Sequence, residues 1–315
     1  MNDIDVLISE VGPRDGLQSI DTIMSTEHKK EWTKAEAEAG VREIEVGSFV
    51  PPKLLPQMAD AFEIVQFAKT IPNLTVVALV PNFFGAKNAI EAGADKLCLP
   101  LSVSETHSQA NLNKSHNEVL EEIRKISEYI AKLDGSEKPD FEGNLSTAFG
   151  CTLEGSVSED KVVKLGAQMM ELGCDEVGLS DTTGYANPNQ VKRLIRLLKK
   201  EVGEENLTSM HLHNTRGLGL ANALASFEEG VTTLDSSLGG IGGCPFAPGA
   251  SGNIVTEDLV FMLDAMGVET GIDIEKLLAV TEKVQSFIPN ESIYGFTKDS
   301  GLPKGYEKGW GVVKS

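Results

Sequence analysis

Cysteine is scarce in this chain of 315 residues, and no two cysteines form a Cys-x-x-Cys pair. The four that occur, Cys98, Cys151, Cys174 and Cys244, are widely separated. So few cysteines in a chain of this length are typical of a protein with reduced thiols, and they exclude a disulfide framework. We therefore expect a cytoplasmic protein.

Long apolar runs and basic leader segments are also missing. No apolar stretch approaches the roughly 18 residues that a membrane-spanning helix needs. The first residues, MNDIDVLISEVG, lack the basic segment followed by an apolar run that marks a secretory signal. Both observations predict a protein that neither spans a membrane nor leaves the cytoplasm.

The chain has far fewer basic than acidic residues. The chain has 28 lysines and arginines against 47 acidic residues, a net charge of −19. Such a chain repels nucleic acid and anionic membrane surfaces, so we expect neither as a partner. An anionic substrate would need locally arranged cations or a bound metal. The hydrophobic fraction of 41% is that of a globular protein and excludes a disordered chain.

The chain alternates between short β-rich runs and segments with helical periodicity. The eight runs cover residues 5–11, 42–50, 74–80, 95–101, 144–149, 175–180, 208–213 and 232–238. Eight such units in about 270 residues predict an α/β fold of the (β/α)8 TIM-barrel type. A doubly wound open sheet is the alternative, but it normally has fewer strands and a glycine-rich turn after the first one. This chain has GPRDG there.

Local signals predict where some of the helices begin. Segment 116–133 has its apolar residues on one helical face, and Ser115 with Glu118 predicts a capping box at its start. Ser156 with Glu159 predicts a second helix start of the same kind.

We expect two parts in the chain. Residues 1–270 form the catalytic barrel. Residues 271–315 form a short C-terminal helical extension, with a helix from Asp273 to Ile288 and a tail rich in glycine and lysine. We expect this extension to pack on the barrel or on a partner subunit.

Two histidines in the seventh run are the sharpest local signal for chemistry. His211 and His213 are two residues apart, so on a strand both side chains point to the same side. Two inward imidazoles with a carboxylate, such as Asp15 after the first run, are suited to a first-row metal. The alternatives are hydrogen-bonded core histidines or, from the His-x-His pair alone, a zinc-dependent hydrolase.

A glycine-rich loop follows the eighth run. It reads GGIGGCPFAPGASGN over residues 239–253 and contains Cys244, which predicts a reactive thiol on a mobile loop. Cys98 and Cys174 have apolar neighbours, so we expect both in the core. His107 is predicted to lie on the solvated surface.

Six motifs occur in order at the predicted strand ends. They are EVGPRDGLQ (10–18), IEVGSFVPPKLLPQMAD (44–60), LVPN (79–82), LSDTTG (179–184), HLHNTRG (211–217) and GGIGGCPFAPGASGN (239–253). Together they resemble the hydroxymethylglutaryl-CoA lyase family of metal-dependent barrel lyases and Claisen enzymes. The resemblance extends from the first strand to about residue 270.

The resemblance implies a set of site residues. Asp15, His211, His213 and Asn253 would bind a divalent metal, and mixed oxygen and nitrogen ligands suit Mg2+ or Mn2+.

The catalytic and substrate-binding residues also follow from the resemblance. Arg14 would stabilise an enolate oxygen, and Cys244 would take the proton of the substrate hydroxyl. Asp181 and Glu45 would transfer protons or hold metal-bound groups. The substrate-binding residues would be Gln18, Ser48 and Asn111.

The implied reaction is a retro-Claisen cleavage of 3-hydroxy-3-methylglutaryl-CoA or a similar acyl-CoA to acetyl-CoA and a ketone or keto acid, acetoacetate for the methylglutaryl compound. A related 3-hydroxy-3-alkyl acyl-CoA stays open as substrate, because Asn214, Arg216 and the lysine-free segment 106–113 depart from the family pattern.

Two other functions remain as alternatives. One is a condensing synthase of the isopropylmalate or citramalate type. The other is a metal-binding barrel without catalysis. The partners implied by the resemblance are a small acyl-CoA and further copies of the chain in a homo-oligomer.

Overall fold

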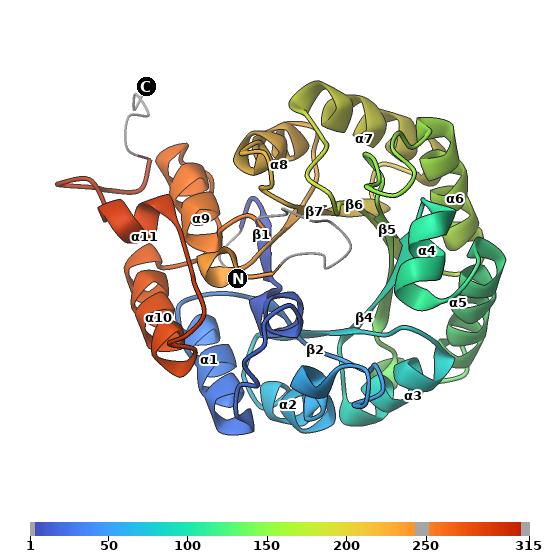
Figure 1. The fold of residues 1–315 in the computed structure, drawn as a ribbon, viewed down its shortest axis with the longest axis horizontal. Coiled ribbons are helices and arrows are strands. Elements are labelled where there is room, and N and C mark those ends of the chain that lie inside the picture. The colour runs from blue at the N-terminus through green and yellow to red at the C-terminus, as the bar shows by residue number, and fades with distance from the viewer. Residues whose placement is uncertain (1–3, 243–251, 310–315) are drawn as a thin grey trace.

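Eight parallel strands close into a barrel in the order β1 to β8, with β1 paired to both β2 and β8. This computed structural model describes residues 4–242 and 252–309. Helices surround the barrel, and the view along its axis shows them as an outer ring (Figure 1). The predicted (β/α)8 fold is confirmed, and the open doubly wound sheet is excluded because no edge strand is left.

The strands agree with the predicted runs except at the fifth. Their bounds are β1 Leu7–Glu10, β2 Glu43–Ser48, β3 Thr75–Leu79, β4 Lys96–Ser102, β5 Asp140–Ser146, β6 Glu176–Asp181, β7 Leu207–Leu212 and β8 Thr233–Ser236. The run predicted for β5 begins four residues too late. Glu142 interrupts the apolar pattern there, but inside the barrel it pairs with Lys96 at 2.8 Å, so the strand includes it.

Helices follow the strands in the expected alternation. They are α1 Thr26–Glu38, α2 Ala61–Ala68, α3 Phe83–Ala92, α4 Glu105–Leu112, α5 His116–Ile130, α6 Glu159–Glu171, α7 Pro188–Val202, α8 Gly219–Glu228, α9 Thr256–Ala265, α10 Ile274–Phe287 and α11 Phe296–Ser300. The capping box at Ser115 and Glu118 is confirmed. The start predicted at Ser156 is wrong, because Ser158 occupies the N-cap of α6.

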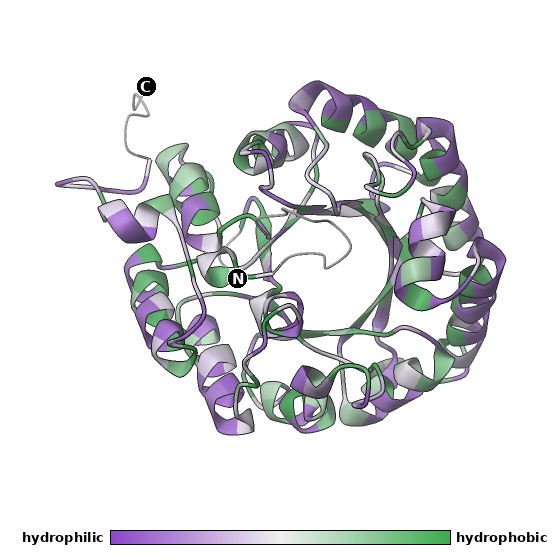
Figure 2. Cartoon of the chain, viewed as in Figure 1, coloured by the Kyte–Doolittle hydropathy of each residue, from purple (hydrophilic) through white to green (hydrophobic). Residues whose placement is uncertain are grey.

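The helices turn apolar faces toward the strands and polar faces outward (Figure 2). In α5, Val119, Ile123 and Ile126 are buried against the barrel, as the periodicity predicts. Within residues 4–242 and 252–309, no helix combines the length and the apolar character that a bilayer crossing requires.

The C-terminal segment packs on the outside of the barrel. The predicted helix at Asp273 is confirmed as α10, which contacts α1 and α9, while α11 contacts α9. The backbone N–H of Asp273 donates to the carbonyl of Ala39 at 2.7 Å, and that of Gly309 donates to Asp264 at 2.7 Å. The division at residue 270 and a contact with a partner subunit stay predictions.

Three buried carboxyl groups lie behind the barrel wall, among β1, α1 and α9. Glu10, Glu36 and Glu257 are all 0% exposed. Burial raises the pKa of Glu10 to about 8, and the charge of Glu257 adds to this rise. Burial also raises the pKa of Glu257 to about 7, with a contribution from the charge of Asp258. Burial, together with the charge of Glu10, raises the pKa of Glu36 well above its usual range. Part of this cluster is therefore protonated at neutral pH.

Replacing Glu36 by glutamine is expected to make the free energy of unfolding less dependent on pH. Above the ordinary pKa of 4.5, the folded chain retains a proton on Glu36 that the unfolded chain releases. Stability therefore falls as the pH rises toward the raised pKa, by at most about 1.4 kcal/mol per pH unit for one group. Glutamine has no such proton to lose. The advantage of Glu36→Gln over the wild type should grow between pH 6 and pH 9.

Urea unfolding at several pH values measures this difference. Glu38→Gln is the matched control, since Glu38 lies two residues along the same helix with a side chain that is 67% exposed. Equal slopes of unfolding free energy against pH for Glu36→Gln and the wild type would contradict the assignment.

Candidate active site

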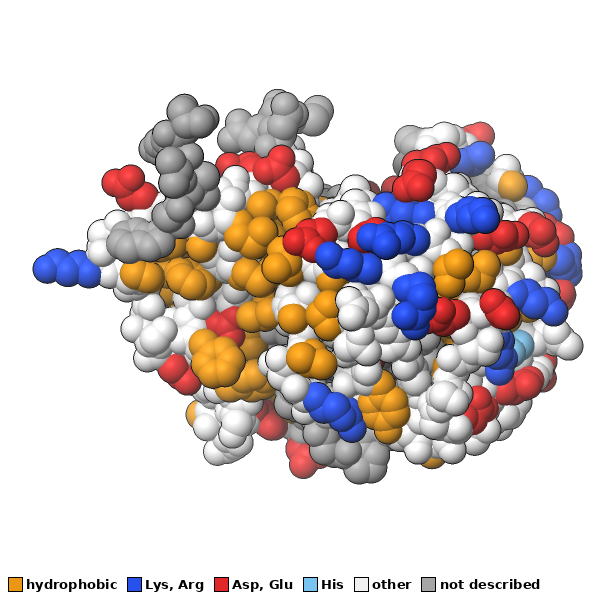
Figure 3. Space-filling model, turned by 90° about the horizontal axis from the view of Figure 1, so that it is seen from above, with side chains coloured by type: hydrophobic (Ala, Val, Ile, Leu, Met, Phe, Trp, Pro, Cys, Tyr) orange, Lys and Arg blue, Asp and Glu red, His pale blue; other side chains and the backbone are white. Residues whose placement is uncertain are grey.

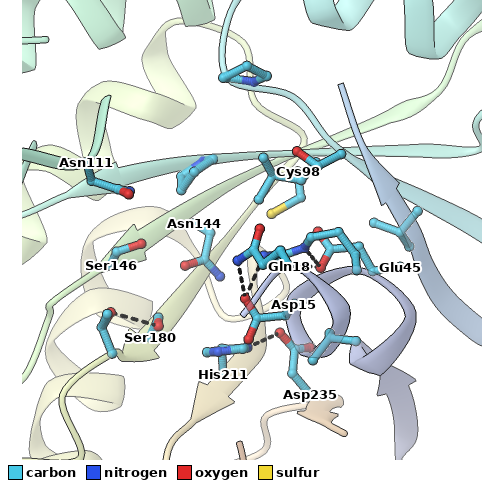
Figure 4. Close-up of a pocket in the computed structure, with 18 of the residues that line it drawn as sticks. Asp15, Gln18, Glu45, Cys98, Asn111, Asn144, Ser146, Ser180, His211 and Asp235 are labelled. Atoms are coloured by element: carbon cyan, nitrogen blue, oxygen red, sulfur yellow. Dashed lines mark hydrogen bonds and ion pairs between the residues drawn. The ribbon is translucent and has the colours of Figure 1, made fainter. Parts of the chain in front are cut away.

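A cavity of about 500 Å³ opens at the carboxyl ends of the strands and extends into the barrel. Residues from several strands and their following loops converge on it (Figure 4). Of the residues predicted from the sequence, these line it: Arg14, Asp15, Gln18, Glu45, Ser48, Asn111, His211 and His213. The structure thus brings together predicted residues that are up to 199 positions apart in the chain (from 14 to 213).

The cavity lining is strongly acidic. Arg14 is the single lysine or arginine among the described residues that line it. Five carboxyl side chains face it in turn: Asp15, Glu43, Glu45, Glu142 and Asp235. An anionic substrate therefore needs a further cation to bind here.

Three of the predicted metal ligands form one cluster. Asp15, His211 and His213 each offer a ligand atom, and these atoms lie within 4.8 Å of one another. The Nε2 atoms of the two histidines are 3.1 Å apart, as predicted for two imidazoles on one side of a strand. Most of the surface of both histidine side chains is buried, so a metal would bind away from bulk solvent.

Asn253 lies at the edge of this cluster. Its Nδ2 donates to Asp15 Oδ2 at 2.8 Å, while its Oδ1 is buried with no hydrogen-bond partner. Backbone pairing with His213 and a bond from its N–H to the carbonyl of Gly242 fix its position. A buried, unpaired amide oxygen beside a carboxylate and two imidazoles fits a divalent cation.

The charge states of the cluster also suit a metal. Burial opposes ionisation of Asp15, but Arg14 and the two histidines outweigh it and lower its pKa to about 2. Burial and the neighbouring His211 lower the pKa of His213 to about 4. A carboxylate and a neutral imidazole at neutral pH are the forms that bind metals.

Asp235 orients His211. Its Oδ2 lies 3.1 Å from His211 Nδ1, which leaves Nε2 to face His213. A carboxylate on the far nitrogen of a histidine ligand is a common support for metal binding. The sequence analysis missed Asp235, although a carboxylate in the middle of the predicted strand 232–238 was a signal of an inward-facing polar group.

Arg14 and Glu45 form an ion pair in the cavity wall. Arg14 follows β1 in the turn η1 (Gly12–Gly16), whose backbone N–H groups at 14 and 15 bond back to Val11. Its guanidinium contacts Glu45 on β2 and donates to Asp15 at 2.7 Å. Burial raises the pKa of Glu45 to about 7 despite this pairing, which is near the value for proton exchange at neutral pH.

Asp181 does not reach the cavity. Both of its carboxylate oxygens accept backbone N–H groups, from Tyr185 at 2.8 Å and Ala186 at 3.1 Å. Its neighbours Ser180 and Thr182 line the cavity instead, because alternate residues of a strand face opposite sides. Asp181, the last residue of β6, thus holds the turn that follows the strand.

The predicted substrate-binding residues lie at different depths. Gln18 donates to Asp15 at 3.0 Å beside the metal cluster. Ser48 is 1% exposed, and its hydroxyl oxygen has no hydrogen-bond partner. Asn111 lies on α4 and is exposed. A ligand could therefore contact polar groups from the metal cluster to the surface.

Several cavity residues were missed or misplaced by the sequence analysis. His107 is only 2% exposed, and its Nδ1 bonds to Ser102 Oγ at 2.8 Å, so the predicted surface position is wrong. Cys98 lines the cavity and is not a core residue, while Cys174 is buried as expected. Asn144 on β5, near the metal cluster, had no sequence signal (Figure 4).

Cys244, the predicted reactive thiol, lies outside the residues that the structure describes. Its assignment stays a prediction from the sequence.

The fold and the site together define a (β/α)8 barrel with metal-binding donors at the carboxyl ends of its strands. The family model described as HMGL-like matches residues 5–284 of this chain. The hydroxymethylglutaryl-CoA lyase of Bacillus subtilis (strain 168) is 39% identical over 295 residues, which are 92% of this chain and 97% of that protein. The mitochondrial hydroxymethylglutaryl-CoA lyase of Macaca fascicularis is 40% identical over 273 residues, 87% of this chain and 82% of that protein. The chain therefore belongs to the HMGL-like family.

A solved structure is similar over nearly the whole chain. An HMG-CoA lyase from Acinetobacter baumannii in complex with coenzyme A and 3-methylmalate has a TM-score of 0.89 at 38% identity. The match covers 98% of this chain and 99% of that one. The carboxyl transferase domain of Rhizobium etli pyruvate carboxylase shares only the fold, with a TM-score of 0.72 at 18% identity over 96% of this chain and 52% of that one.

Proposed function

We propose that this protein is a carbon–carbon lyase that cleaves 3-hydroxy-3-methylglutaryl-CoA to acetyl-CoA and acetoacetate. The observation that carries the proposal is the cluster of Asp15, His211 and His213 beside the Arg14–Glu45 pair in one cavity. The relatives named hydroxymethylglutaryl-CoA lyase, at about 40% identity over most of the chain, support the same reaction.

The reaction breaks one carbon–carbon bond and moves one proton from the hydroxyl oxygen to C2. The 3-hydroxyl loses its proton, its oxygen becomes a carbonyl, and the bond between C2 and C3 breaks. The bonding electrons pass to the thioester as an enolate, which then takes a proton at C2 to give acetyl-CoA. The barrier is lowered by groups that stabilise charge on the thioester oxygen and that supply and accept protons.

Arg14 would stabilise the enolate. Its guanidinium lines the cavity and is held by Glu45 on one side and Asp15 on the other. A cation fixed before the reaction stabilises the developing negative charge without reorganising. Glu45, with a pKa near 7, holds or exchanges a proton next to that oxygen. The role of Cys244 as the base for the hydroxyl stays part of the proposal.

Asp15, His211, His213 and Asn253 would hold the divalent cation, either Mg2+ or Mn2+. When bound, such a cation supplies a Lewis acid for the hydroxyl and carboxylate oxygens of the substrate. In a cavity with a single arginine, it also offsets the surplus of carboxylates that would repel an anionic acyl group.

The acyl group has a neutral polar wall to contact. Asn144 and Ser146 on β5, Ser180 on β6 and Thr182 directly after β6 line the cavity. Figure 4 shows Asn144 on the side of the metal cluster. These groups can bond to a carboxylate or to a hydroxyl, so a related 3-hydroxy-3-alkyl acyl-CoA is the second candidate substrate. A condensing synthase would use the same site in the opposite direction.

The test is release of acetyl-CoA from 3-hydroxy-3-methylglutaryl-CoA by the purified protein with Mg2+ or Mn2+ and a thiol reductant. We expect rapid release, its loss after treatment with EDTA, and its recovery when either cation is added back. Acetyl-CoA is measured by coupled conversion with a second enzyme, and acetoacetate is measured independently.

Each other outcome is informative. Turnover by metal-free protein would overturn the metal assignment. Absence of cleavage in protein shown to bind Mn2+ would overturn this substrate and direct the assay to 3-alkyl analogues. Condensation of acetyl-CoA with a 2-keto acid under the same conditions would favour the synthase.

Location and association complete the proposal. A cytoplasmic location stays a prediction, supported by the few, widely separated cysteines. Association of copies is supported by hydrophobic side chains that gather over α8 and α9 on one face (Figure 3). Leu218, directly before α8, and Met266, directly after α9, are exposed. Sedimentation analysis measures the association state.

A further inference from the structure

Glu10 is the last residue of β1, and its side chain points away from the cavity. Its neighbour Ser9 lines the cavity, so Glu10 faces the helices outside the barrel wall. It is 0% exposed. Nothing in the proposed reaction needs a carboxyl group at this place.

The carboxyl group of Glu10 binds two active-site loops at once. Its Oε1 accepts the backbone N–H of Gly12 at 2.8 Å and that of Leu238 at 2.9 Å. Gly12 begins the turn that contains Arg14 and Asp15. Leu238 begins the segment that follows β8 and leads toward Gly242.

The second oxygen of Glu10 reaches a third segment. Thr256 Oγ1, in the first residue of α9, donates to Glu10 Oε2 at 2.6 Å. Thr256 comes three residues after Asn253, and Gly12 comes three residues before Asp15. One buried side chain therefore joins the segments that contribute these two members of the metal cluster.

The local sequence is adapted to this contact. A Cβ atom at Gly12 would lie 2.6 Å from Glu10 Oε1 and 2.9 Å from Ser237 Oγ, closer than atoms approach in proteins. Glycine at this position thus allows the backbone to reach the carboxyl group. Glu257 adds a parallel contact, because its two oxygens accept the N–H of Gly239 at 3.2 and 3.0 Å.

We propose that Glu10 is a positioning residue for the lyase site, which sets the distance between the Asp15 turn and the segment from Leu238 to Gly242 through its bonds to Gly12 and Leu238. The inference rests on the proposed function for its effect on turnover. Its effects on metal binding and on amide exchange around residues 12 and 238 do not need the reaction.

The test compares three substitutions of Glu10. Glutamine keeps an oxygen for the two N–H groups and resembles the carboxyl group, whose raised pKa leaves it largely protonated at neutral pH. Aspartate is one methylene shorter and cannot reach both loops. Leucine has a similar size but no acceptor, so both N–H groups would be buried and unpaired.

We expect Glu10→Gln to bind Mn2+ and turn over within about twofold of the wild type. We expect Glu10→Asp and Glu10→Leu to lose about 10-fold or more in Mn2+ affinity, measured by electron paramagnetic resonance of the free ion, and a similar factor in kcat. Amide hydrogen exchange should rise together at the segments around residues 12 and 238 in both variants. If Glu10→Leu does not fold, the contrast between aspartate and glutamine still decides.

Two control variants separate the loss of positioning by Glu10 from a general loss of stability and from the removal of a buried carboxyl group. Ile123→Ala, on the buried face of α5, should lower Tm without changing Mn2+ affinity or kcat. Glu36→Gln removes another buried carboxyl group of the same cluster and should leave both quantities unchanged.

Wild-type metal affinity, loop exchange and turnover in Glu10→Asp and Glu10→Leu would overturn the inference. So would equal losses in Glu10→Gln and Glu10→Leu, because the acceptor geometry would then not matter. A wild type without lyase activity whose variants still show the exchange pattern would instead count against the proposed function alone.

Discussion

Arg14→Gln is expected to lower kcat for cleavage of 3-hydroxy-3-methylglutaryl-CoA by about 100- to 1000-fold, the usual effect of losing one fixed group that stabilises an oxyanion. Arg14 is the single arginine or lysine that lines the described part of the cavity, so no neighbouring cation replaces it. KM should change much less than kcat, because the negative charge on the thioester oxygen develops mainly in the transition state. Steady-state kinetics at saturating Mg2+ measures both constants.

Two comparisons make this result specific. Arg124→Gln changes an exposed arginine of α5, which pairs with Glu121 and Glu128 on the same helix, and should keep wild-type kinetics. Arg14→Lys keeps a positive charge but not the planar fork that contacts both Glu45 and Asp15, and should recover part of the activity. Near wild-type kcat in a folded Arg14→Gln protein would remove Arg14 from the mechanism.

Asp15→Asn is expected to weaken Mn2+ binding by about 100-fold or more and to lower turnover with it. The substitution keeps the shape of the side chain but removes the negative charge from the cluster with His211 and His213. Since loss of a supporting residue alone costs about 10- to 100-fold in metal affinity, loss of a ligand charge should cost at least as much. Titration of the free Mn2+ signal gives the affinity directly.

Asp235→Asn is the comparison variant, for which we expect a smaller loss of Mn2+ affinity than for Asp15→Asn. Asp235 touches the cluster only through His211 Nδ1, so its substitution should weaken Mn2+ binding less than that of Asp15. Mn2+ affinity that is unchanged in Asp15→Asn would show that the cation binds elsewhere. The opposite order of the two variants would assign Asp235 the larger role.

The fold was predictable because its signals are local and repeated. Each strand except β5 matches a β-rich run of the sequence, and the capping box of Ser115 and Glu118 marks the start of α5. The start of β5 was not predictable, since Glu142 is stabilised by its ion pair with Lys96 on the neighbouring β4 and by a hydrogen bond from Ser209 on β7. A pattern read along one chain does not show such partners on other strands.

The site was predictable where residues follow strand ends in recognisable motifs. Arg14, Asp15, His211 and His213 are found together as expected. Asp181 was not, because a strand end does not show which of two neighbouring side chains faces inward, and its carboxylate bonds the turn after β6. Glu10 stands in the same motif, but its contact with Leu238 joins positions 228 residues apart.

The charge of the cavity also bears on the order in which ligands arrive. Lys96 pairs with Glu142 and lies 4.0 Å from Glu43, which offsets part of the acidic charge. Asp15, Glu45 and Asp235 still outnumber Arg14, so the cation-free cavity repels an acyl-CoA that carries its own carboxylate. On the proposed function, the cation therefore binds first and the substrate second, in a compulsory order. Free acyl-CoA and acetoacetate would then compete for the cation-loaded protein and hardly associate with the cation-free one.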